Sequence, residues 1–449
     1  MSSHTPIKRR ERDAILQSLQ AGLVPKHGLH LIQVGRKAEV TSLLADLDRI
    51  ADDGAAFRVC VGRFGSGKSF FLNLIRTLAF QKKLAVAQAD FTMQRRLYST
   101  GGEARALYSE LMRNLATRAQ PDGGALASVL STWASQIQHG VLQSGGTAAD
   151  AEAKMMSDLK ELQNFVGGFE FAEAVRAFYR GHVDGNDAQQ AAALRWLRGE
   201  YETKTEARQD LGVRRIIDDQ NIYESLKLMA VFLRRAGLGG LLVSLDELVV
   251  LSHRLPSTRA RQANYEALLT LLNDCLQGTA RGLGFVFAGT DECLEDKRRG
   301  LFSYEALRSR LAENTLAKQQ GLTDLSGPVI RLQPLTPEDL FVLLRNIALV
   351  HASGDPAKIL TNDEGIAAVL HKANETLGAD FFRTPRDVVR AFVGLLNVLD
   401  QNPGQTWQSV LNAATFQAPT QPASTEEEIA TGQGAAPADE DDDLASFKL

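Results

Sequence analysis

The residues best suited to chemistry form one glycine-rich string that ends in lysine and serine. It reads Gly62-Arg63-Phe64-Gly65-Ser66-Gly67-Lys68-Ser69, and Phe70 follows directly. Glycines let backbone N–H groups converge on phosphate oxygens, lysine supplies a cation, and a serine hydroxyl is a ligand for Mg²⁺. The string follows a short apolar run and precedes a helical stretch, which disfavours a chance glycine turn. We therefore expect residues 62–70 to bind ATP, with Lys68 on the β- and γ-phosphates and Ser69 on Mg²⁺.

Two adjacent carboxylates provide a second candidate element. Asp246 and Glu247 end the apolar run Leu241–Leu245. Acids at the carboxyl end of a buried strand are placed where ligands of parallel sheets bind. We expect Asp246 to hold Mg²⁺, directly or through water, and Glu247 to polarise the attacking water. A solvated strand end is the alternative.

A threonine and three arginines are candidates for completing the reaction site. Thr290 follows the apolar run 283–289 and could orient water, or simply cap the next helix. Arg308 and Arg310 could reach the ATP of a neighbouring subunit and neutralise charge in the transition state. Arg386 stands in the first turn of a helix expected from Pro385, within possible reach of the γ-phosphate. For all three arginines the alternative is an ordinary solvated side chain.

Short apolar runs separated by helical stretches predict the frame that positions these residues. The alternation favours an α/β fold with a five-stranded parallel sheet. Its expected strands are Phe57–Val61, Leu84–Ala89, Leu241–Leu245, Leu283–Ala288 and Val329–Leu332.

The pattern also divides the chain into segments. Residues 1–33 are an N-terminal helical segment, 34–90 the first part of the core, and 241–333 its second part. The stretch 91–240 is too long for a loop and reads as a helical insertion. Residues 334–414 read as a helical lid, in which Thr336 caps a helix that begins with Pro337. The remainder, 415–449, has the composition of a disordered acidic tail.

Composition excludes several classes of protein. No run of eighteen apolar residues exists, and the first twelve residues lack the apolar stretch of a signal peptide, so we expect a cytoplasmic protein with no membrane contact. Cys60, Cys275 and Cys293 are too widely spaced for a zinc site or a disulfide framework. The formal net charge is −4, but residues 417–449 carry −7 of it and leave +3 for the rest. Such a balance neither requires nor excludes nucleic acid.

These elements together resemble the AAA+ ATPases over about residues 34–400. The resemblance makes Val34-Gly35-Arg36 the box before the first strand, Thr290 sensor 1, Arg310 part of the arginine-finger box and Arg386 sensor 2. Because Arg308 is a second candidate beside Ser309-Arg310, the choice of finger stays open.

Within that class, the chain is most similar to the bacterial BREX-system ATP-binding proteins, related to the origin-recognition and STAND-like branch. The residues that carry this similarity are Arg9-Arg10, Gly22-Leu23-Val24-Pro25, Gly28-Leu29, Gly65–Phe71, Leu211–Arg214, Ile217–Asp219, Asn221 and Leu226-Lys227. It implies a role in antiphage defence or on mobile elements, beside helicases or DNA-modifying proteins.

Three functions are compatible with these features. The first is an ATP-driven oligomeric remodeller or loader that acts with DNA-processing partners. The second is a signalling switch that ATP holds at rest and a phage component releases. The third is a passive nucleotide-bound scaffold. The basic pairs Arg95-Arg96, Arg214-Arg215 and Arg298-Arg299 could meet DNA phosphates, but without interleaved aromatics or a recognised DNA-binding motif solvated faces are favoured.

Overall fold

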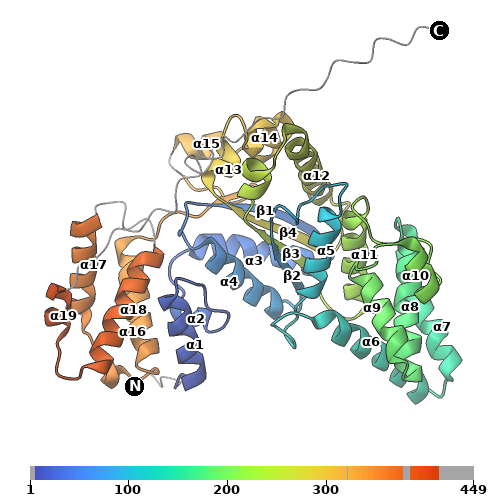
Figure 1. Ribbon diagram of the computed structural model, residues 1–449, viewed down its shortest axis with the longest axis horizontal. Coiled ribbons are helices and arrows are strands. Elements are labelled where there is room, and N and C mark those ends of the chain that lie inside the picture. Colours follow the sequence, from blue (N-terminus) through green and yellow to red (C-terminus); the bar gives the residue numbers. More distant parts are fainter. Residues whose placement is uncertain (1–5, 321, 378–384, 414–449) are drawn as a thin grey trace, which may run out of the picture.

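A five-stranded, all-parallel sheet forms the centre of the molecule (Figure 1). The computed structural model describes residues 6–320, 322–377 and 385–413. The strand order is β2-β3-β4-β1-β5. The strands are β1 (Ala55–Val61), β2 (Ala85–Asp90), β3 (Leu241–Asp246), β4 (Leu283–Gly289) and β5 (Val329–Arg331). The fold class and the five strands expected from the sequence are therefore confirmed.

Side chains of the central strands alternate between two hydrophobic cores. On β1, Phe57 and Val59 face one core and Cys60 faces the other. This alternation follows from the two-residue repeat of a strand, and both faces are apolar because helices cover both. The parallel register places the carboxyl ends of all the strands at one edge of the sheet.

One face of the sheet is covered by two helices, α3 (Lys37–Ala51) and α4 (Lys68–Gln81). The other face packs against α5 (Glu103–Arg113), α11 (Ile222–Arg235) and α12 (Thr258–Gln277). The π-helical turn η2 (Val250–Arg254) joins β3 to α12.

The stretch between β2 and β3 is helical and extends away from the sheet (Figure 1). Its outer elements are α6 (Ala125–Gln143), α7 (Ala148–Asp158), η1 (Lys160–Asn164), α8 (Gly168–Asp184), α9 (Asp187–Leu197) and α10 (Lys204–Leu211). Their apolar residues, such as Trp133 and Phe171, belong to the same core as β1 and β4. The insertion is thus joined to the sheet by a continuous apolar interior.

On the opposite side, both ends of the described chain share one helical group (Figure 1). It contains α1 (Arg9–Gln20), α2 (Leu29–Ile32), α16 (Pro337–His351), η4 (Pro356–Lys358), α17 (Asp363–Leu377), α18 (Pro385–Gln401) and α19 (Trp407–Ala413). Thr336 caps α16 and Pro337 begins it, as expected, and Asp339 completes a capping box.

Short helices follow the fourth strand, namely α13 (Asp291–Glu295), η3 (Leu301–Ser303), α14 (Glu305–Leu311) and α15 (Thr315–Gln319). No helix in the described ranges is long and apolar enough to cross a membrane. The tail expected at 415–449 lies outside the described residues.

Candidate nucleotide-binding site

The glycine-rich string forms a tight loop between β1 and α4. Gly65 and Gly67 have φ of 76° and 89°, a left-handed conformation that glycine adopts without steric cost. Gly67 is the residue immediately before α4, so the first-turn amides of that helix open onto the loop. The Lys68 ammonium donates to the carbonyl oxygens of Gly62 and Arg63, each at 2.9 Å. The loop thus combines the free amides at the start of α4 with the Lys68 ammonium, an arrangement suited to bind an anion.

The acidic pair lies beside this loop. The pair stands at the end of β3 and the loop follows β1, and β4 lies between these two strands. The Ser69 hydroxyl donates to Oδ2 of Asp246 at 2.9 Å. Both residues, and Glu247, line one pocket together with residues 64–68. A hydroxyl and a carboxylate at this separation are hard oxygen ligands of the kind that Mg²⁺ prefers, so the residues present fit that ion.

Glu247 has an unusual backbone. Its φ is 59°, in the left-handed region that residues other than glycine rarely adopt. Its backbone N–H donates to Oδ1 of Asp246 at 2.8 Å. Strain of this type is typical of functional sites. It turns the chain sharply at the end of β3.

Burial, together with neighbouring charges, shifts the pKa of two groups in the pocket. Loss of water at the pocket wall raises the pKa of the Glu247 carboxyl, and the negative charges of Asp246 and Asp90 raise it further. Asp90 is the partner of Asp246 in the register of β2 and β3. Burial lowers the pKa of the Lys68 ammonium, while Asp246 and Glu247 act in the opposite direction. A carboxyl with a raised pKa is suited to accept a proton from water.

Thr290 follows β4, between the strands that carry the loop and the acidic pair. The preceding carbonyl, that of Gly289, accepts a hydrogen bond from the N–H of Gly62 at 3.2 Å. Thr290 occupies the capping position of α13, but its hydroxyl makes no capping hydrogen bond. Among the described residues this buried hydroxyl has no partner at all. In the described part of the chain, Thr290 is not part of the lining of the pocket that holds the loop and the acidic pair.

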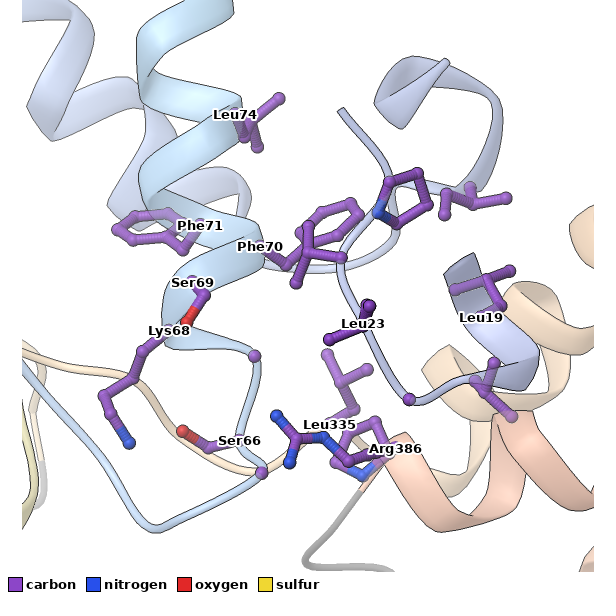
Figure 2. Close-up of a pocket in the computed structure, with 18 of the residues that line it drawn as sticks. Leu19, Leu23, Ser66, Lys68, Ser69, Phe70, Phe71, Leu74, Leu335 and Arg386 are labelled. Atoms are coloured by element: carbon purple, nitrogen blue, oxygen red, sulfur yellow. The ribbon is translucent and has the colours of Figure 1, made fainter. Parts of the chain in front are cut away.

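Arg386 begins the other wall of the pocket. Its side chain projects from the start of α18 towards the loop, as Figure 2 shows. Its guanidinium carbon lies 5.1 Å from the centre of the Phe64 ring, a cation–π contact at an exposed site. Thr384, which precedes this helix, lies outside the described residues.

A third, apolar wall was not foreseen from the sequence. It is formed by the chain between α1 and α2 together with α4, α16 and α18 (Figure 2). Its main residues are Leu23, Val24, Pro25, Ile32, Val34, Phe70, Leu343 and Val389. The stretch 22–25 supported only the family resemblance, since nothing in its pattern indicates contact with α18. Phe70, which the sequence places among the expected ATP-binding residues, lines this wall.

Arg36 links that wall to the loop. Its guanidinium donates to the carbonyl of Ser66 at 2.7 Å, and its φ of 57° is again left-handed. The glycine-arginine box before the first strand thus contacts the glycine-rich loop directly.

The two finger candidates lie elsewhere on α14 and do not line the pocket of their own chain. Arg308 pairs with Glu305, and Arg310 donates to Oδ1 of Asn273 at 2.6 Å. Both side chains are exposed. Their surroundings leave the choice between them open.

Comparison with known proteins connects this geometry to a family. The family model described as "BREX system ATP-binding protein BrxC/D" matches residues 7–415. The chain belongs to the BREX system ATP-binding family. This membership indicates an ATP-binding protein of an antiphage defence system. No curated protein matches the chain.

Proposed function

We propose that this member of the BREX ATP-binding family hydrolyses ATP with the help of Mg²⁺, as an oligomeric remodeller or loader that works with DNA-processing partners. The observation that carries the proposal is the pocket that joins a phosphate loop, an acidic strand end and Arg386. Nucleotide binding alone needs only the first of these.

The chain's own residues divide the work. Loop amides and Lys68 hold the β- and γ-phosphates of ATP. The apolar wall around Leu23 and Val389 receives the adenine ring. Ser69 and Asp246 would hold Mg²⁺, which neutralises phosphate charge when it is bound. Glu247 accepts the proton of the attacking water, and the unpartnered hydroxyl of Thr290 orients that water.

Arginines of the same chain and of a neighbouring subunit stabilise the negative charge of the transition state. Arg386 leaves Phe64 and turns to the γ-phosphate when ATP enters, which draws the C-terminal helices onto the sheet. Arg308 or Arg310 reaches the ATP of the neighbouring subunit, which makes the enzyme active only as an oligomer. Their exposure on α14 supports this assignment.

The proposal is tested by ATP binding and phosphate release with purified protein. Lys68→Ala removes the cation and should weaken ATP binding by at least about 10²-fold, because a desolvated charge–phosphate contact is lost. Lys82→Ala, on the surface at the far end of α4, is the matched control and should bind as the parent does. Unchanged affinity in Lys68→Ala, or no phosphate release by the parent chain with Mg²⁺, would refute the proposal.

A further inference from the structure

Five exposed cations lie on two segments that contact each other, and each segment follows a strand of the sheet. Arg254 and Arg259 lie between β3 and the first turn of α12, and Lys297, Arg298 and Arg299 lie between α13 and η3. Within the described part of the chain none of the five side chains is held in an ion pair. The basic pair Arg95-Arg96 differs, since its two members are paired with Glu110 and Glu103.

Specific contacts bring the two segments together. His253 Nε2 lies 3.4 Å from Oδ2 of Asp296. The other oxygen of Asp296 accepts the backbone N–H groups of Arg298 and Arg299, at 2.6 and 2.9 Å. The Tyr265 hydroxyl of α12 donates to the carbonyl of Arg299. These contacts fix the backbone of residues 297–299. They also occupy both carboxylate oxygens of Asp296, the acid next to the three cations in the sequence.

We propose that this basic cluster, defined as Arg254, Arg259, Lys297, Arg298 and Arg299, binds the phosphate backbone of a nucleic acid. Four of its five members are arginines, whose planar forks match phosphate oxygens in a bidentate manner. Outside residues 417–449 the chain carries a formal charge of only +3, so a local cluster is where the electrostatic attraction of a polyanion concentrates. No base-reading element accompanies the cluster, and the contact is therefore independent of sequence.

The cluster also reaches the catalytic edge of the sheet. The π-helical turn η2 runs from just after Glu247 to Arg254, and such turns are frequent at functional sites. Arg254 ends this turn, so a phosphate held by Arg254 is joined through η2 to the end of β3. We therefore expect bound nucleic acid to change the rate of ATP turnover. This coupling rests on the proposed function, whereas the binding itself does not.

The test is binding of fluorescein-labelled single-stranded and double-stranded oligonucleotides, without ATP, over a series of salt concentrations. Arg298→Glu/Arg299→Glu should weaken binding to at least one form by about tenfold or more, and the slope of log affinity against log salt should fall by about two. The control is Arg208→Glu/Arg214→Glu, which reverses two exposed cations of the insertion and should leave both quantities close to the parent's. Circular dichroism checks that the variants are folded.

Three results would overturn the inference: no binding by the parent, equal loss in both double variants, or displacement of DNA by polyglutamate at equal charge concentration. The last would assign the cluster to an acidic polypeptide. ATP turnover is measured separately, and the variant should keep the basal rate and lose the change that the oligonucleotide causes. If the parent binds DNA but hydrolyses no ATP, the proposed function fails while the basic cluster stands.

Discussion

Glu247 combines a strained backbone with a carboxyl whose pKa is raised. The left-handed φ of this residue is strained for any residue with a Cβ atom, whereas glycine adopts it freely. Its carboxyl also lies near the negative charges of Asp246 and Asp90. Both features oppose stability, and both fit the proposed role of Glu247 as the base that accepts a proton from water beside the phosphate loop.

The strain predicts the relative stability of two variants that both lack the carboxyl. Glu247→Gly should be about 1 kcal/mol more stable than Glu247→Ala, because only glycine is free of the Cβ clash at positive φ. Urea denaturation of the two variants measures the difference. If alanine is as stable as glycine here, the backbone at this position is not strained.

The charge environment predicts a shift in the pH dependence of ATP turnover. Asp90→Asn removes a negative charge that raises the pKa of Glu247, so that pKa falls and Glu247 stays deprotonated to lower pH. The acidic limb of the rate profile should then move to lower pH. Asp187→Asn, on the outer insertion, should leave the limb in place. A limb that moves to higher pH in Asp90→Asn would contradict the assignment of Glu247 as base.

At the scale of elements, the sequence predicts the strands well because each is a short apolar run bounded by turns. It also places Lys68, Ser69, Asp246 and Glu247 at one edge, because parallel strands share their direction. The apolar wall could not be predicted in this way. It depends on contacts between the chain at 22–34 and α16 and α18, more than three hundred residues away.

The position of Arg58 is another feature that only the structure explains. This arginine interrupts an otherwise apolar strand, β1, and its guanidinium binds both carboxylate oxygens of Asp46 on α3. It also donates to the carbonyls of Leu325 and Gly327. The pair thus ties the loop before β5 to the strand that carries the phosphate loop.

Removal of one partner of this buried pair should be costly. Asp46→Ala leaves Arg58 buried without its counter-ion, with an expected loss of about 3–5 kcal/mol in the free energy of unfolding. Asp48→Ala, on the same helix, breaks only a surface pair with Lys82 and should cost at most about 1 kcal/mol. Chemical denaturation of both variants gives the comparison. Equal losses would show that the buried pair does not hold the fold.

At the scale of the whole molecule, the nucleotide pocket joins the sheet to the helical group formed by both ends of the chain. Residues from α4, α16, α18 and the loop after α1 all line it. We propose that ATP in this pocket stabilises one arrangement of these parts, in which the exposed α14 meets a second subunit. A remodeller should therefore assemble when ATP binds, whereas a signalling switch should remain monomeric until its trigger arrives.

Mixing experiments test whether the finger acts between subunits. The Arg308→Ala/Arg310→Ala chain keeps an intact ATP site, and the Lys68→Ala chain keeps both arginines. Each should be inactive alone, with a loss of about 10³-fold for a missing finger. Their mixture should regain ATP turnover if an arginine crosses the interface. No recovery in mixed oligomers confirmed by mass measurement would exclude a finger supplied by the partner subunit.

We propose above that the loop at residues 62–69 and the acid at 247 form one hydrolytic site. The most direct measurement is the fate of radiolabelled ATP on the Glu247→Gln protein in the presence of Mg²⁺. We expect this variant to bind ATP as tightly as the parent and to retain it uncleaved, with phosphate release slowed by about 10²-fold or more. Phosphate release at the parent's rate would contradict the proposal.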